Sequence, residues 1–179
     1  MSAPIVIEDY DPHWPEQFEV LRARIAPALG PLAAVIEHVG STAIPGLAAK
    51  PIIDIDVLLR SAADLPEAIT RLATLGYLHR GDLGVPGREA FRPPPDDVPH
   101  HLYVCVPESL EYARHVTFRD HLRTHPEDAG AYERLKRALA VEFGDDREAY
   151  NQAKTHFVEA ILRRAATMEH SAPGGRIIP

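Results

Sequence analysis

The sequence predicts an α+β domain in which a small mixed β-sheet is flanked by helices and followed by a helical half. Short runs rich in β-branched residues lie within about residues 1–107, whereas apolar residues at helical spacing dominate about residues 108–168. Strands that come early and helices that come late are typical of the α+β class. The length of 179 residues fits one domain, which we place at residues 1–170.

The composition is that of an ordinary globular protein, with 45% hydrophobic and 25% charged residues. The formal net charge of -7 disfavours long nucleic acid as a partner. Cys105 is the single cysteine, so the chain forms no internal disulfide and no cysteine-based zinc site. No window approaches the ~20 apolar residues of a membrane span. We therefore expect a cytoplasmic protein without a membrane partner.

The elements follow from periodicity and from the residues that end helices and strands. Proline and glycine placement predicts a short edge strand at Ile5–Ile7 and a helix from near Trp14 to Gly30. The remaining expected elements are a strand at 34–39, a short helix at 43–49, a strand at 52–59, a helix at 64–75, strands at 77–80, 89–92 and 101–106, and helices at 109–124, 126–143 and 146–168. The tail from Ser171, residues 171–179, is expected to be disordered.

Two carboxylates on the strand at 52–59 carry the chemistry. The run alternates cleanly, so Asp54 and Asp56 point to one face while Ile53, Ile55 and Val57 point to the other. Carboxylates two residues apart on a strand lie about 6 to 7 Å apart, near enough to share one or two Mg²⁺ ions. Asp54 and Asp56 are therefore the candidate catalytic metal ligands, with Mn²⁺ as an alternative ion. The competing interpretation is a solvated strand face.

A glycine-serine turn precedes that strand. Gly40 permits close backbone approach, and the turn aims free N–H groups and the Ser41 hydroxyl at a phosphate, with Thr42 as a further candidate contact. Lys50 lies between the two halves of the motif, where it is either a surface residue or a point charge for a phosphate. Arg88 flanks a loop rich in glycine and proline, where a guanidinium group can bind phosphate.

Two pairs at i, i+4 spacing on the helix at 109–124 are further candidates. Arg119 and Arg123 fall on one helix face and form a candidate phosphate fork, against the plainer reading that they are solvated or paired. His121 and His125 have the spacing of zinc-binding helices, but no glutamate follows His121 and Pro126 is expected to break the helix there. A zinc hydrolase is therefore a minor alternative.

The stretch from His38 to Asp56, HVGSTAIPGLAAKPIIDID, resembles the signature of the GrpB family. Supporting motifs in the helical half are Phe118–Arg123, Tyr132 with Lys136, and Tyr150 with Lys154. The resemblance covers about residues 5–166. It implies membership of the nucleotidyltransferase superfamily, whose pattern of a Gly-Ser turn followed by Asp-x-Asp on a strand is matched here. It also implies a link to coenzyme A metabolism, because the family occurs fused to dephospho-CoA kinase in some organisms.

One departure concerns the third carboxylate that the superfamily usually supplies from a later strand. The corresponding strand begins His101-Leu-Tyr103 and carries no acid. His101 is an additional candidate metal ligand, and Glu89 on the preceding strand is a candidate substitute for the missing acid. Loss of a charged ligand should weaken Mg²⁺ binding, so the departure bears on catalysis more than on nucleotide binding.

Three functions follow from these observations. The first is a Mg²⁺-dependent nucleotidyltransferase that moves a nucleoside monophosphate from a nucleotide to a small acceptor or a protein hydroxyl. The second is a non-catalytic module that binds a nucleotide, a CoA-like compound or another small phosphate ligand. The third is an accessory role in folding or in the coenzyme A pathway, with a protein partner and a vestigial pocket.

Overall fold

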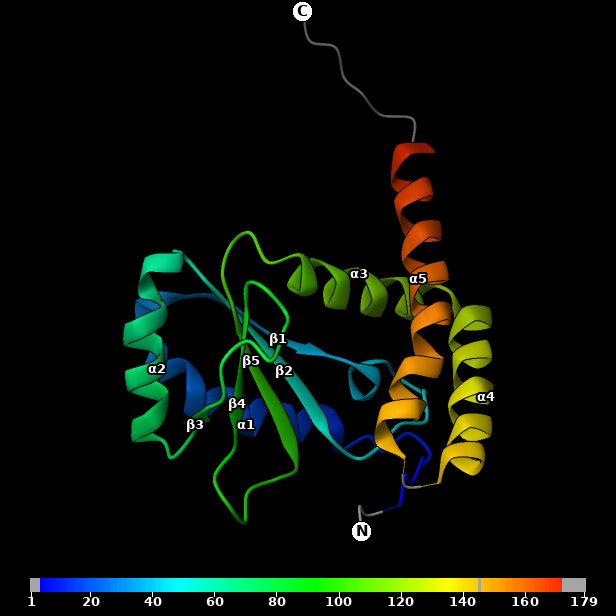
Figure 1. Cartoon of the computed structure of the whole chain (residues 1–179), viewed down its shortest axis with the longest axis horizontal. Coiled ribbons are helices and arrows are strands. Elements are labelled where there is room, and N and C mark those ends of the chain that lie inside the picture. The colour runs from blue at the N-terminus through cyan, green and yellow to red at the C-terminus, as the bar shows by residue number, and fades with distance from the viewer. Residues whose placement is uncertain (1–3, 145, 172–179) are drawn as a thin grey trace, which may run out of the picture.

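The structure is a computed structural model that describes residues 4–144 and 146–171 of the chain (Figure 1). In these ranges, the sheet half contains helices α1 (Trp14–Leu29) and α2 (Leu65–Thr74) and strands β1 (Ala33–Val39), β2 (Ile53–Leu59), β3 (Leu78–His79), β4 (Arg88–Arg92) and β5 (His100–Cys105). Short 3-10 turns are η1 (Gly30–Leu32), η2 (Ser41–Ala43) and η3 (Ala62–Asp64). The helical half consists of α3 (Leu110–Thr124), α4 (Pro126–Phe143) and α5 (Arg147–Ser171).

The five strands form one sheet in the order β1-β2-β5-β4-β3. Strands β2 and β5 run parallel, while the other neighbouring pairs are antiparallel. The α+β class, the small mixed sheet and the helical C-terminal half expected from the sequence are confirmed.

One face of β2 is packed against α1 and α2. Ile53, Ile55 and Val57 are at most 1% exposed and belong to the same core cluster as Leu21 and Ile25 of α1. The α1 residues recur at three- and four-residue spacing, which places them on the buried face of that helix. Burial of each such side chain contributes about 1.5 to 3 kcal/mol. The alternation of β2 therefore leaves its two aspartates on the opposite face.

The helical half holds the loop that joins the Gly-Ser turn to β2. Ile44 and Leu47 of this loop share a core cluster with Leu122 of α3, Tyr132 of α4 and Ile161 of α5. Figure 1 shows α4 and α5 lying side by side beyond the end of the sheet. The sheet and the helices are thus joined through the segment that carries the candidate phosphate site.

Two expected elements were wrong. The segment at Ile5–Ile7 forms no sheet strand, because the Ile5 N–H donates to the Gly144 carbonyl at 3.0 Å and the Ile5 side chain packs in a cluster with Leu139 and Tyr150. Directly after this segment, Glu8 forms an isolated antiparallel bridge with Ala49. The helix expected at 43–49 is limited to η2, since the chain continues through Pro45 and through Gly46 at a φ of 79°.

The expected disordered tail, apart from Ser171 at the end of α5, lies outside the described residues. Within residues 4–144 and 146–171, none of the helices combines the length and the apolar character that a membrane crossing needs.

Candidate functional site

The Gly-Ser turn lies directly beside the carboxylate strand. Val39, the last residue of β1, pairs with Asp54 in the antiparallel register, so Gly40 follows immediately next to Asp54. Gly40 has a φ of 71°, and a Cβ atom added there would lie 2.1 Å from Asp54 Oδ2 and 2.9 Å from Asp54 Cβ. Rotation of the carboxylate cannot relieve the second contact. Position 40 therefore requires glycine both for its backbone conformation and for its space.

Thr42 and His38 hold the turn from inside. The Thr42 hydroxyl donates to the Ile52 carbonyl at 3.3 Å and lies 3.0 Å from His38 Nε2. Because the hydroxyl hydrogen points at Ile52, His38 donates from Nε2 to the Thr42 oxygen. Burial lowers the pKa of His38 to about 4, so this imidazole is neutral at physiological pH. The Thr42 hydroxyl is thus engaged in supporting the turn.

Arg119 and Arg123 also bind the turn segment. The Arg119 guanidinium donates to the His38 carbonyl at 2.9 Å and forms an ion pair of 2.6 Å with Glu37. Arg123 donates from Nε and Nη2 to the Ala43 carbonyl at 3.0 and 2.7 Å. The pair expected as a phosphate fork therefore fastens α3 to the backbone on both sides of Gly40.

Asp54 and Asp56 point to the same face of β2, as expected, and each contacts a histidine. Asp54 Oδ1 lies 2.8 Å from His101 Nδ1, and this hydrogen bond raises the pKa of His101 above its ordinary value. Asp56 Oδ2 lies 2.7 Å from His115 Nδ1, and Glu111 lies 3.2 Å from the other nitrogen of that ring. Burial by itself would lower the pKa of His115, but the hydrogen bonds to Asp56 and Glu111 outweigh it and raise the pKa to about 9.

Asp56 is the more unusual of the two carboxylates. It is 0% exposed, and burial raises its pKa against the opposing effect of His115. Its second oxygen, Oδ1, is buried and has no hydrogen-bond partner among the described residues. A buried carboxylate oxygen without a partner costs free energy, because desolvation is not compensated. This atom is therefore a ready ligand position for a cation.

Strand β5 carries an imidazole and a phenol at the positions where the sequence resemblance implies a third acid. His101 and Tyr103 pair with Asp54 and Asp56 in the parallel register and so lie on the same face. Arg88 stacks on the Tyr103 ring, with its Cζ atom 4.3 Å from the ring centroid. The Nε atom of Arg88 is buried and makes no hydrogen bond to any described residue. Arg88 thus lies on the carboxylate face with an unused donor.

Glu89 cannot replace the missing acid from its strand. It pairs with Val104, whose side chain belongs to the core on the opposite face of the sheet, and its carboxylate lies 2.6 Å from His79 Nε2. The acid near the site is Glu111, which comes from the first turn of α3 and bonds to His115.

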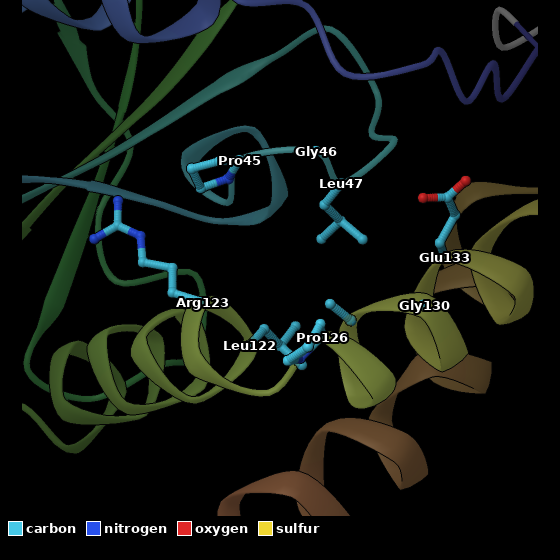
Figure 2. Close-up of a pocket in the computed structure, with 9 residues that line it drawn as sticks. Pro45, Gly46, Leu47, Leu122, Arg123, Pro126, Gly130 and Glu133 are labelled. Atoms are coloured by element: carbon cyan, nitrogen blue, oxygen red, sulfur yellow. The ribbon is translucent and has the colours of Figure 1, made fainter.

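A cavity of about 910 Å³ opens over the carboxylate face of the sheet. It is lined by Gly40, Ser41, Thr42, Lys50, Asp54, Arg88 and His101, all of which the sequence singled out. Asp56 is not among the lining residues and is fully buried, but its hydrogen-bond partner His115 lines the cavity. A second cavity of about 470 Å³ lies between the loop at Pro45–Leu47 and the start of α4, and of the candidate residues only Arg123 lines it (Figure 2).

The donors fit an oxygen-bound divalent cation with an incomplete protein shell. Asp54 and Asp56 present carboxylate oxygens on one face, and Asp56 Oδ1 has no competing partner among the described residues. No group of three or more His, Cys, Asp or Glu side chains in the described chain is arranged to hold a metal ion. Mg²⁺ commonly takes one or two carboxylates and completes its six ligands with phosphate oxygens and water. The zinc alternative is not supported, since His121 pairs with Asp128 at 2.7 Å and stacks on His125.

With this geometry established, comparison with known proteins decides the family. The model of the family described as GrpB protein matches residues 4–164. The chain belongs to the GrpB family. The crystal structure of GrpB from Enterococcus faecalis has a TM-score of 0.83 and 32% identity, and the match covers 93% of this chain and 100% of that one.

More distant or partial similarities were also found. The UPF0157 protein YqkA of Bacillus subtilis is 34% identical over 156 residues, which is 87% of this chain but 46% of YqkA, so this GrpB chain spans about half of that relative. A dephospho-CoA kinase of Mycolicibacterium paratuberculosis is 40% identical over 78 residues, or 42% of this chain and 19% of the kinase. The fold has a distant similarity to the Cid1 poly(U) polymerase, with 11% identity and a TM-score of 0.43 over 65% of this chain and 39% of that one.

Sequence reasoning missed several residues of the site. His115 and Glu111 lie four residues apart, and this spacing places them on one face of α3. No local sequence pattern specifies where α3 lies relative to β2, so the contact of His115 with Asp56 could not be predicted. Tyr132 with Lys136 and Tyr150 with Lys154 were noted only as motifs, and the structure brings all four into the cavity.

Proposed function

We propose that this GrpB protein is a nucleotidyltransferase that binds a nucleoside triphosphate with Mg²⁺ at Asp54 and Asp56. Its nucleoside monophosphate moves to an acceptor hydroxyl, with release of pyrophosphate and of the hydroxyl proton. The observation that supports this most is the buried, unpartnered Oδ1 atom of Asp56 beside a turn that must be glycine to accommodate Asp54. A carboxylate pair whose first member packs directly against a Gly-Ser turn would combine a cation site with a phosphate site. Mn²⁺ is an alternative ion.

Each residue has a distinct task in this proposal. Gly40 and Ser41 bind a phosphate through the backbone and hydroxyl, and Lys50 and Arg88 supply positive charge from two sides of the cavity. Thr42 keeps the turn in place. His101 orients Asp54, with coordination as an additional role, and His115 orients Asp56. A bound Mg²⁺ would neutralise charge on the transferring phosphoryl group, which is most of what phosphoryl transfer requires of a protein.

A second candidate is a module that binds a nucleotide or a CoA-like compound without turnover. It is favoured by one observation, the His101 and Tyr103 side chains at the β5 positions where a third carboxylate would complete the metal shell. The partial match to a dephospho-CoA kinase is the basis for the related proposal of a coenzyme A pathway or folding-accessory role with a protein partner.

Calorimetric titration with each NTP and with CoA, with and without Mg²⁺, separates these functions. The transferase proposal expects Mg²⁺-dependent binding of an NTP that is lost in Asp54→Asn and Asp56→Asn but kept in Asp64→Asn, a control aspartate outside the cavity. An affinity for NTP that is the same with and without Mg²⁺, and the same in both site variants as in the wild type, would favour the non-catalytic module. Absence of binding to every NTP and to CoA would contradict both and favour the accessory role.

A further inference from the structure

All three lysines of the chain lie in one cavity. The sequence contains 19 basic Lys and Arg residues, of which only residues 50, 136 and 154 are lysine. Lys50 comes from the loop before β2, Lys136 from α4 and Lys154 from α5, and each lines the cavity over the carboxylate face. Segments far apart in the sequence therefore deliver the same chemical group to the same place.

Two tyrosine rings hold the three ammonium groups. The Nζ atoms of Lys50 and Lys154 lie 4.2 and 4.3 Å from the centroid of the Tyr150 ring. The Lys136 Nζ atom lies 4.8 Å from the centroid of Tyr132 and donates a hydrogen bond to the Ala48 carbonyl. In both helices the tyrosine precedes its lysine by one helical turn, so each helix presents a ring and an amine on one face.

The lysines lack the counter-charges that the arginines have. Most arginines of the described chain that make close contacts pair with carboxylates, as Arg114 does with Glu159 and Arg137 with Asp9. No described carboxylate lies within ion-pair distance of Lys50, Lys136 or Lys154, although Lys136 is 2% exposed. Burial and mutual repulsion lower the pKa of Lys136 to about 7 and that of Lys154 to about 8. Clustered amines without acids are costly unless an anion supplies the missing charge.

The cluster continues from the Gly-Ser turn. Ser41 and Tyr132 line the same cavity, and the Tyr132 ring contacts Lys136. Lys50 and Lys154 meet at the Tyr150 ring, whereas Arg88 stacks on Tyr103, the β5 residue that pairs with Asp56. The cavity therefore has a lysine end at Tyr150 and an arginine end at Tyr103.

We infer that Lys50, Lys136 and Lys154 form a subsite for a polyphosphate chain, binding the outer phosphates of a ligand whose inner phosphate lies at the Gly40-Ser41 turn. Arg147 lines the same cavity, and its charge lowers the pKa of Lys50. Arg147 therefore adds a fourth positive charge to the three lysines. This inference takes its geometry from the proposed function and narrows the ligand to compounds with two or more contiguous phosphates. A monophosphate ligand would leave the lysine end unoccupied.

The test uses inorganic anions without metal, so that it does not depend on the carboxylate centre. Binding of orthophosphate, pyrophosphate and tripolyphosphate is measured by calorimetry in EDTA at constant ionic strength, with the full chain. We expect affinity to rise with chain length and to fall at least tenfold for tripolyphosphate in the double variant Lys136→Met, Lys154→Met. The matched control is Arg134→Met, Arg163→Met, which removes the same charge from exposed positions of the same two helices. It should change the affinity less than twofold.

Chemical labelling provides a readout that does not depend on variants. Pyridoxal 5′-phosphate with borohydride reduction modifies accessible amines, and mass spectrometry separates the three lysines from the N-terminal amine. Tripolyphosphate should protect Lys50 and Lys154, the two partly exposed lysines, and leave the N-terminal amine labelled. Equal losses in the lysine and arginine double variants, affinity that is independent of chain length, or labelling that is not protected would each overturn the subsite.

The outcome is separable from that of the proposed function. Asp54→Asn and Asp56→Asn should leave metal-free tripolyphosphate binding intact or strengthen it, while they abolish Mg²⁺-dependent nucleotide binding. A wild-type protein that binds a nucleotide with Mg²⁺ but does not bind tripolyphosphate without metal would contradict the lysine subsite alone. A wild-type protein that binds tripolyphosphate without metal but shows no Mg²⁺-dependent nucleotide binding would contradict the nucleotidyltransferase proposal alone.

Discussion

The carboxylate of Asp54 occupies the space that a side chain at Gly40 would need. A Cβ atom at position 40 would lie 2.1 Å from Asp54 Oδ2 and 2.8 Å from its Cγ. The turn and the carboxylate strand are therefore a single unit, in which the backbone of the turn can approach the Asp54 carboxylate only because residue 40 has no side chain.

Gly40→Ala should displace Asp54 and lower the free energy of unfolding by about 2 kcal/mol or more, through the clash and the positive φ together. Urea unfolding measures the loss, and Mg²⁺-dependent nucleotide binding should disappear in the same variant. Gly84→Ala is the control, because Gly84 has a φ of 79° but open space around its Cβ position. If both variants lose the same stability, the contact with Asp54 has no energetic consequence.

Thr42→Val should lower the free energy of unfolding by about 1 to 2 kcal/mol, because the hydroxyl that bonds to Ile52 and His38 is buried. Thr42→Ser keeps the hydroxyl and should recover most of the stability. Chemical denaturation of both variants checks this. A Val variant of unchanged stability but weakened nucleotide binding would instead assign the hydroxyl to direct phosphate contact.

His115→Gln should destabilise the fold in a pH-dependent manner. Folding raises the pKa of His115 from 6.5 to about 9, so the folded state binds the proton more tightly and its contribution is fully present below pH 6.5. The contribution is lost as the pH rises through about 9. We expect a difference of about 2 kcal/mol between wild type and variant at pH 6 that shrinks by pH 9.5. Urea unfolding across this range measures it, with exposed His156→Gln as the control; a constant difference would show that the imidazolium is not the stabilising species.

Lys136→Met should stabilise the ligand-free protein. Folding lowers the pKa of Lys136 from 10.5 to about 7, so the unfolded state binds more protons between these values and the folded state is penalised most below pH 7. The free energy of unfolding of the variant should exceed that of the wild type by at least about 1 kcal/mol at pH 6 and by less at pH 9, because each pKa unit corresponds to about 1.4 kcal/mol. Thermal unfolding at the two pH values tests this. A variant that is less stable at both would mean that the bonds to Ala48 and Tyr132 outweigh the burial of the amine.

The local sequence pattern was sufficient to predict the main helices and strands and part of the candidate site. Alternation along β2 predicts that Asp54 and Asp56 share a face, and helical spacing predicts α1 and α3 to α5 within a few residues. The segment at Ile5–Ile7 shows the limit of such reasoning. Its β-branched residues suit a strand, but the Ile5 side chain is buried beside Leu139 and Tyr150, a choice made by packing rather than by propensity.

The sequence by itself determined the α+β class, the carboxylate pair and the glycine turn, because these depend on periodicity and on backbone conformations that neighbouring residues impose. Only the tertiary structure decided that His115 bonds to Asp56, that Arg119 and Arg123 fasten the turn, and that Lys50, Lys136 and Lys154 meet around two tyrosine rings. Apart from the tyrosine–lysine pairs within α4 and within α5, those contacts join residues tens of positions apart. Their geometry follows from how α3, α4 and α5 pack against the sheet and the loop, and no local spacing encodes that packing.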